Sequence, residues 1–324
     1  MLQAMRRNTE QGILTKKNKN SMGLIRNARE LEMPKTMTIM IYGQAGCGKT
    51  TLALGAEKPL LLDFDGGVRR VRTEHLADVG TVQVQRWQDV IDVLSDSESI
   101  SGFSTIVVDT VGKMIDFIQD YECNGRQPRI QDWGRINKDV KWFCQELSKM
   151  GKDVIFIAHR TMEKRGEDMV FIPNVRSKNY NDIVTDLDLL GYMEMRSVQG
   201  VQTRSITFDP TSENDGKNTC GLPSVIRIPV AGAKNTFLRD SVIKAFRDVY
   251  REKEKAVKEY AAEVEEMERT VAQITDAEGA NKFCAALKGQ SYGNDLLVRV
   301  RDMLRMRVAE LGLRYDKETK VYSA

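Results

Sequence analysis

Paired cysteines are absent from this 324-residue sequence, and so is any Cys-x-x-Cys spacing. Five cysteines are present, an odd number, and they are widely separated. This usage argues against a disulfide framework and a cysteine-based zinc site, and it favours a reducing compartment. The five are Cys47, Cys123, Cys144, Cys220 and Cys284.

Long apolar runs are also absent. No segment approaches the roughly 18 apolar residues of a membrane helix, and the start MLQAMRRNTEQG has no apolar signal-peptide core. We therefore expect a cytoplasmic protein that does not enter a membrane. The net charge is only +3 with 29% charged residues, so the chain is not a polycation and any contact with nucleic acid must be local.

Three regions differ in composition along the chain, and its length suggests two folded units because domains usually hold about 100 to 200 residues. Residues 1–35 carry eight Lys or Arg against three acids, which predicts a basic arm. This arm either contacts a phosphate backbone or a neighbouring subunit, or it is a solvated tail. Residues 36–240 form the expected core, and residues 241–324 are predicted to be helical and highly charged.

The core region predicts an α/β fold. Short apolar strands alternate with amphipathic helical segments, which is typical of a mostly parallel sheet sandwiched by helices. The expected strands are 38–42, 60–64, 81–85, 105–109 and 153–159, and the expected helices are 50–56, 87–96 and 132–149. Three further strands, expected at 187–194, 203–209 and 224–228, would extend one edge of the sheet with antiparallel members.

An apolar seam marks the C-terminal region. Apolar residues recur at spacings of three and four from Val257 to Ile274, which is typical of a coiled coil or a helical hairpin. The seam packs either against the protein's own core or against another subunit. Two more helices are predicted, one starting at Thr275–Glu278 and one starting after Tyr292 and reaching about Leu311.

A phosphate-binding loop follows the first expected strand. The pattern G-x-x-x-x-G-K-[ST] is complete, and a helix is expected directly behind it. Glycines let backbone NH groups converge on phosphate at a helix N-terminus. We expect ATP, with Lys49 reaching the β- and γ-phosphates and Thr50 ligating Mg²⁺. The cofactor-binding residues would be Gly43, Gln44, Ala45, Gly46, Cys47, Gly48, Lys49, Thr50 and Thr51.

Acidic side chains end two of the expected strands. The apolar strand 105–109 delivers Asp109 to the carboxyl edge of the sheet, where a carboxylate can hold Mg²⁺ through water. Asp63 and Asp65 follow a strand that we expect beside the phosphate-loop strand, and either could face the γ-phosphate and orient water. The alternative is that these acids are turn formers, as Asp often is.

A polar residue ends another apolar strand. The strand 153–159 delivers His159 to the same edge, where a hydrogen-bonding group can sense the γ-phosphate and signal to the basic segment that follows. The alternative is a histidine satisfied within a loop.

Taken together, the phosphate loop, Leu-Leu-Asp-Phe-Asp-Gly-Gly, Thr-Ile-Val-Val-Asp-Thr-Val-Gly and Val-Ile-Phe-Ile-Ala-His-Arg resemble the core of the RecA-like ATPases. The resemblance is closest to phage-type AAA-domain ATP-binding proteins that include single-strand annealing recombinases, and it spans about Met37 to Ile228. It implies that Asp65 activates water and that His159 couples the γ-phosphate to a DNA-binding loop at 160–181. It also implies a basic residue from a neighbouring subunit, for which Lys217 is the candidate. The family usually has Glu where Asp65 stands, which puts efficient hydrolysis in doubt.

The resemblance therefore implies an ATPase that acts as a homo-oligomer on single-stranded DNA in phage or prophage recombination. Its catalytic residues would be Lys49, Asp65, Asp109, His159 and Lys217. Alternatives are a small-molecule or nucleoside kinase, and a nucleotide-gated adaptor with little turnover. The DNA loop would use Arg160, Lys164, Arg165, Arg176 and Lys178, with Phe171 and Tyr180 stacking on bases, although Glu163, Glu167 and Asp168 leave a solvated loop open as an alternative.

Overall fold

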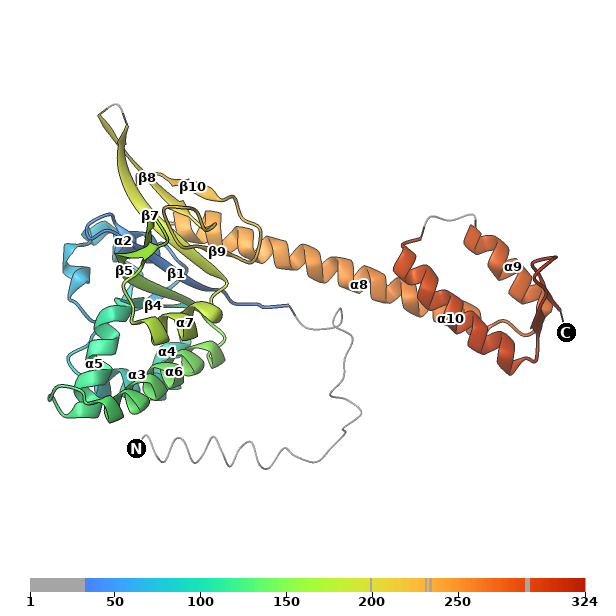
Figure 1. Ribbon diagram of the computed structural model, residues 1–324, viewed down its shortest axis with the longest axis horizontal. Helices are drawn as coiled ribbons and strands as arrows, with labels where there is room; N and C mark the ends of the chain where they lie inside the picture. The colour runs from blue at the N-terminus through green and yellow to red at the C-terminus, as the bar shows by residue number, and fades with distance from the viewer. Residues whose placement is uncertain (1–32, 199, 231, 233–234, 289–291, 324) are drawn as a thin grey trace. The chain divides into compact units, whose positions relative to one another are not determined.

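The computed structural model describes residues 33–198, 200–230, 232, 235–288 and 292–323 (Figure 1). The described residues fall into two compact units, one comprising Pro34–Arg251 and the other containing Glu252–Ala324. Residues 1–32 of the predicted basic arm lie outside the described residues. The division into 1–35, 36–240 and 241–324 stays a prediction.

A ten-stranded sheet forms the larger unit, in the order β10-β8-β7-β1-β5-β4-β2-β3, with β6 paired to β5 and β9 paired to β7. The strands from β3 to β7 in this order run parallel, whereas β6, β8, β9 and β10 pair antiparallel. Their bounds are β1 Thr38–Gly43, β2 Pro59–Asp63, β3 Gly80–Gln83, β4 Thr105–Asp109, β5 Asp153–Arg165, β6 Asp168–Pro173, β7 Leu189–Val198, β8 Val201–Thr207, β9 Lys217–Asn218 and β10 Val225–Ile228.

Helices cover both faces of this sheet (Figure 1). One face packs against α2, η6 and the first turn of α8, and the other packs against α3, α5 and α6. The bounds in this unit are α2 Lys49–Ala53, η3 Gly67–Arg70, η4 Thr73–His75, α3 Trp87–Ser95, α4 Ser97–Ser101, α5 Val111–Cys123, η5 Ile130–Asp132, α6 Trp133–Lys149, α7 Ser177–Thr185 and η6 Leu238–Ile243. Helix α8 spans Lys244–Ala272.

The core explains why the central strands read as continuous apolar runs. In β1, Ile39 and Ile41 belong to the cluster with α2 and η6, while Met40 and Tyr42 alternate to the opposite face, and all four are fully buried. A strand covered on both faces needs an apolar side chain at every position. The predicted fold class is confirmed as an α/β RecA-like core with a mostly parallel sheet, helices on both faces and helices at the C-terminal end.

Helix α5 and the β5–β6 hairpin were not predicted from the sequence. Helix α5 follows β4 directly and buries Val111, Met114, Ile115 and Ile118, a spacing of three and four that indicates a helix. Strand β5 continues past His159 to Arg165 and turns into β6, so the segment expected to be a loop begins as an antiparallel hairpin.

The unit containing Glu252–Ala324 has its own apolar core. Val264, Val271 and Ile274 pack with residues of α9 (Ala277–Lys288) and α10 (Asn294–Glu310). The seam therefore packs within its own unit, as one of the two expected alternatives had it. A two-stranded sheet of β11 (Arg314–Tyr315) and β12 (Tyr322–Ser323) completes the unit. Among all helices in the described ranges, none is both long and apolar enough to cross a bilayer.

Candidate functional site at the phosphate loop

The phosphate loop lies between β1 and α2, at the carboxyl edge of the sheet. Gly43 ends β1 where the backbone passes so close to β7 that a Cβ would lie 2.1 Å from the carbonyl oxygen of Met193, so only glycine fits. Gly48 caps α2 with φ +98°, a left-handed conformation that glycine adopts at little cost. Both glycines of the motif are thus required by the backbone geometry of the loop.

Lys49 is buried, and its ammonium points back into the loop. Nζ donates to the carbonyl oxygen of Gly43 at 3.1 Å and to that of Gln44 at 2.8 Å. Burial lowers the pKa of Lys49, and the nearby negative charges of Asp109 and Asp65 oppose this shift. The carbonyl oxygens of the loop therefore hold the Lys49 ammonium in place, and the oxygens of a bound phosphate could replace them as acceptors.

Thr50, in α2, and Asp109, at the end of β4, are in direct contact. The Thr50 hydroxyl donates to Asp109 Oδ2 at 2.6 Å, and Asp109 is buried. Burial raises the pKa of Asp109 to about 6, the Thr50 hydrogen bond opposes that rise, and the charges of Asp65 and Asp63 add to it. A hydroxyl and a carboxylate beside a phosphate site are the hard oxygen donors that Mg²⁺ takes together with substrate phosphates and water. These residues therefore fit the predicted metal.

Asp63 and Asp65 reach the site from β2, but the expected position of β2 was wrong. Strand β2 pairs with β4 and β3, and β4 and β5 separate it from β1. Asp63 is buried, and its two carboxylate oxygens accept hydrogen bonds from the NH groups of Gly67 and Val68, so it stabilises the turn. Asp65 accepts from Gly67 at 2.9 Å and keeps 22% of its side chain exposed. Its charge acts on Lys49 and Asp109, so Asp65 is the acid available to a reactant.

His159 lies beside Gly43 in the register of β5 and β1. Its carbonyl oxygen accepts from the NH of Asn174, and its ring is exposed. Partial burial and then the charge of Lys49 lower the pKa of His159, so the ring is neutral near pH 7. His159 and Asp65 line one cavity of about 280 Å³ together with Thr110, Lys113, Asn174 and Arg176, among others.

Lys217, the candidate basic residue for a neighbouring subunit's site, is not part of this group. Lys217 lies in β9 and pairs with Leu190 of β7. The β7 residue beside Gly43 of the phosphate loop is Met193, three residues further on, which is about 10 Å along the strand. Its ammonium donates to the carbonyl oxygens of Val184 and Thr185 at the C-terminal end of α7. A cation is favoured at that end of a helix, so this contact holds Lys217 within its own chain. A role for it in a neighbour's site stays a prediction.

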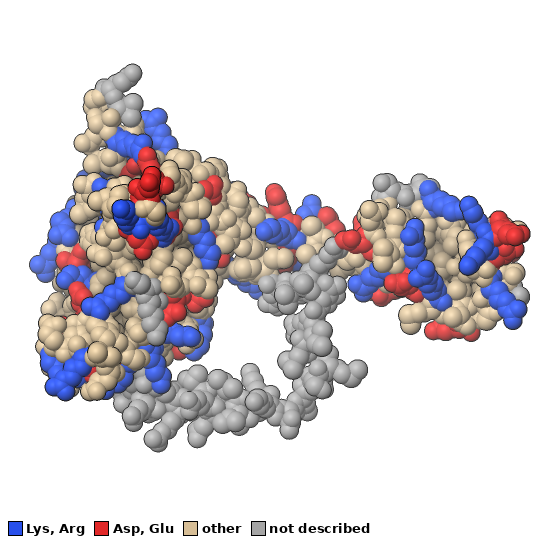
Figure 2. All heavy atoms as spheres, viewed as in Figure 1, with Lys and Arg blue, Asp and Glu red and all other residues tan. Residues whose placement is uncertain are grey.

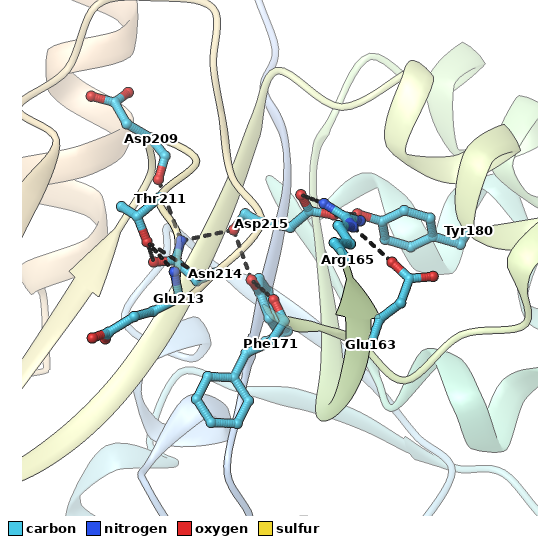
Figure 3. A network of polar contacts seen from close by, with 10 residues as sticks. Glu163, Arg165, Phe171, Tyr180, Asp209, Thr211, Glu213, Asn214 and Asp215 are labelled. Carbon is cyan, nitrogen blue, oxygen red and sulfur yellow. Dashed lines mark hydrogen bonds and ion pairs between the residues drawn. The ribbon is translucent and has the colours of Figure 1, made fainter. Parts of the chain in front are cut away.

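Two of the three basic residues in the β5–β6 hairpin, Arg160 and Arg165, have partners, and Figure 3 shows the contacts of Arg165. Arg165 forms a two-pronged ion pair with Asp215 at 2.9 and 3.0 Å and another with Glu163. The Tyr180 hydroxyl also donates to Asp215, and the Tyr42 hydroxyl contacts the carbonyl oxygens of Asp215 and Phe171. Tyr42 directly precedes the phosphate loop, so this network joins the loop's strand to the hairpin.

The two residues expected to stack on bases are engaged as well. Phe171 stacks on Tyr192, and the Arg160 guanidinium lies 4.0 Å from the centre of the Phe171 ring. Arg160 also bonds to the Tyr192 hydroxyl and reaches Gln44 of the phosphate loop at 3.4 Å. Arg176 lies over the ring of Trp133. Among the hairpin cations in the described part of the chain, Lys164 alone has no ion pair or hydrogen-bond partner from its side chain.

Arg204 was missed by reasoning from the sequence. It lies in the middle of β8, opposite Met195 and Ile228, and its guanidinium reaches the side of the phosphate loop. A cavity of about 300 Å³ begins there, lined by Gly48, Thr51, Leu52, Arg204 and Asn235. The Asn235 side chain donates to the carbonyl oxygen of Thr51. No motif marks Arg204, because only the pairing of the edge strands brings it to the loop.

Comparison with known proteins shows which family the core resembles. A family described as AAA domain matches residues 35–220. The SPbeta prophage-derived uncharacterized protein YorG of Bacillus subtilis (strain 168) is 25% identical over 173 residues, 49% of this chain and 51% of YorG. This chain therefore spans about half the length of that curated relative.

Two solved structures are also similar. The KaiC-like protein PH0186 of Pyrococcus horikoshii OT3 is 14% identical with a TM-score of 0.37, covering 60% of this chain and 89% of that one. The RadB recombinase is 18% identical with a TM-score of 0.34, covering 53% of this chain and 79% of its own. The AAA domain match includes the phosphate loop, Asp65, Asp109 and His159 and extends over more than half of the 324 residues, so this chain belongs to the AAA domain family.

Proposed function

We propose that this protein is a Mg²⁺-dependent ATPase that acts on single-stranded DNA in phage or prophage recombination. One observation carries the ATPase part: Lys49, the Thr50–Asp109 pair, Asp65 and His159 gather at one edge of the sheet beside a complete phosphate loop. A phosphate ligand, a metal ligand and a carboxylate for water are the parts that hydrolysis of a terminal phosphate needs.

The residues have separable roles in this proposal. Lys49 leaves the loop carbonyls and neutralises charge on the β- and γ-phosphates. Thr50 and Asp109 would hold Mg²⁺, which would supply further positive charge to neutralise the phosphates. Asp65 orients the attacking water, and neutral His159 donates a hydrogen bond toward the γ-phosphate.

Action on DNA is supported by the resemblance to phage-type proteins that include annealing recombinases and by the prophage origin of the relative YorG. The hairpin itself is electrically balanced, with Arg160, Lys164 and Arg165 offset by three acids. On the face drawn in Figure 2, basic side chains of the unit Pro34–Arg251 are scattered among neutral and acidic ones. We therefore assign the DNA contact to Lys164 at the hairpin, and a homo-oligomer would bring several hairpins to one strand.

The test is steady-state phosphate release with and without single-stranded DNA, with particle mass measured in the same buffer. The proposal expects DNA-stimulated hydrolysis that requires Mg²⁺ and an assembly larger than one chain. Hydrolysis that is unchanged by DNA at low salt, where phosphate contacts are strongest, would refute the DNA part alone.

A kinase is the second candidate, and one observation favours it. The cavity of about 280 Å³ beside Asp65 and His159 has the polar groups Lys113, Asn174 and Arg176, which could hold an acceptor molecule. The same assay separates the two functions, because a kinase releases ADP without matching amounts of inorganic phosphate when its acceptor is present. Equal release of ADP and phosphate with every nucleoside offered would exclude a nucleoside kinase.

A further inference from the structure

Arg204 presents an unpaired positive charge to the phosphate loop. A Cβ at Gly48 would lie 3.5 Å from Arg204 Nη1 and 3.7 Å from Cζ, so the guanidinium lies against the loop. Arg204 is half-buried, and within the described ranges its guanidinium has neither a hydrogen bond nor an ion pair. The other two cations at the loop have partners, Lys49 in loop carbonyls and Arg160 in Gln44 and Tyr192.

An unpaired charge that is partly withdrawn from water is costly, so a ligand that pairs with it is favoured. A guanidinium offers planar, two-pronged donors that match phosphate oxygens and gives stronger bonds than neutral donors do. The chemistry of Arg204 therefore points to an anionic oxygen group beside Gly48.

The adjoining cavity indicates which phosphate this is. Backbone NH groups of a phosphate loop hold the α- and β-phosphates, with the γ-phosphate on the side of the metal and the attacking water. That side is here marked by Asp65 and Asp109, whereas Arg204 lines the cavity of about 300 Å³ that starts at Gly48 and Thr51. Apolar walls and a few polar groups suit a nucleoside. The walls include Leu52, Met193, Ile228, Pro229 and Phe237, with Asn235, Thr236 and Ser241 as polar groups.

We propose that Arg204 binds the α-phosphate of a nucleotide held by the phosphate loop of the same chain, and that this cavity takes the ribose and base. The inference rests on the proposed function, because it needs a nucleotide on the loop. Arg204 then contributes to ground-state binding of diphosphate and triphosphate alike.

The test is calorimetric binding of ADP and of a slowly hydrolysed ATP analogue to the full chain. Arg204→Ala and Arg204→Gln are expected to weaken both nucleotides by the same factor, about 10- to 100-fold, the scale of a lost charge-assisted hydrogen bond. Arg204→Lys recovers part of the affinity, since it restores the charge without the fork. Arg196→Ala is the matched control: Arg196 lies in neighbouring β7 with Glu194 and Glu213 as partners, and its loss leaves both affinities unchanged.

Unchanged affinity for both nucleotides in folded Arg204→Gln protein would overturn the inference. Weakening of the ATP analogue alone would also overturn it, because it would place Arg204 at the γ-phosphate. Failure of the wild-type protein itself to bind either nucleotide would instead refute the proposed function. Melting curves of each variant separate loss of binding from loss of folding.

Discussion

Replacing Asp109 with Asn should stabilise the free protein while abolishing the proposed Mg²⁺-dependent ATP hydrolysis. The Asp109 carboxylate is 3% exposed, and burial raises its pKa from 3.8 to about 6. A shift of this size corresponds to about 3 kcal/mol of unfavourable free energy for holding the charge in the folded state. Asn keeps an oxygen that can accept from Thr50 at the same place, so most of this cost is removed.

The sign and the pH window follow from the two pKa values of Asp109. Above pH 6 the group is ionised in both states, so the folded state bears the full cost. Between pH 6 and 4 the folded state takes up a proton first, and the cost falls to roughly half by pH 5. The gain from Asp109→Asn should therefore be largest at pH 8, and for a unit of this size about 3 kcal/mol raises Tm by about 6 to 12 °C.

Thermal melts in EDTA without nucleotide, at pH 8 and pH 5, measure this gain. Asp116→Asn is the control, because Asp116 is exposed and paired with Lys113 at 3.3 Å, and we expect no pH-dependent gain there. A fall in Tm of Asp109→Asn that is equal at both pH values would refute the reasoning, since it would mean that the carboxylate stabilises the free fold.

Four further predictions concern single side chains. Lys49→Ala should abolish tight ATP binding in calorimetry because it removes the only ammonium within the loop; wild-type affinity would contradict the phosphate-loop assignment. Asp65→Asn should leave Mg-ATP affinity intact and lower phosphate release by about 10²-fold, and unchanged turnover would show that another group orients water. Lys164→Ala should weaken single-stranded DNA binding and reduce its salt dependence more than Arg165→Ala, because Arg165 is already paired with Asp215; equal effects would argue against Lys164 as the contact. Lys217→Ala subunits mixed with Asp65→Asn subunits should regain part of the turnover if Lys217 acts on a neighbour, and no recovery despite confirmed co-assembly would confine Lys217 to the α7 contact.

The sequence predicted a site residue correctly where the strand that carries it determines its position in the sheet. A parallel strand buried on both faces leads to the carboxyl edge of the sheet. The end of β4 therefore placed Asp109, and the last parallel pair of β5 with β1 placed His159. The phosphate loop was equally predictable, because its residues are contiguous in the sequence. Gly48 meets a local demand for a left-handed φ, whereas Gly43 meets the close approach of β7.

The sequence predicted the role of a residue poorly where contacts between segments distant in the sequence determine its partners. Strand alternation makes Asp63 and Asp65 look equivalent, and only the turn at Gly67 shows that Asp63 is committed to backbone NH groups. The sequence singled out Lys217 and missed Arg204, because the pairing of β9 and β8 with β7 keeps Lys217 away from the phosphate loop and brings Arg204 to it. Likewise, the sequence does not reveal the partners of the basic residues in the hairpin. Arg165, for example, forms an ion pair with Asp215, fifty residues further along the chain.

A structure with Mn²⁺ and a slowly hydrolysed ATP analogue tests the central claim most directly. Mn²⁺ substitutes for Mg²⁺ and can be located by its anomalous scattering. We predict the metal beside the Thr50 hydroxyl and within water-bridging reach of Asp109, the Lys49 ammonium moved from the Gly43 and Gln44 carbonyls to the β- and γ-phosphates, and Asp65 facing the γ-phosphate. A nucleotide bound away from this loop, or a metal held without Thr50 and Asp109, would contradict the account.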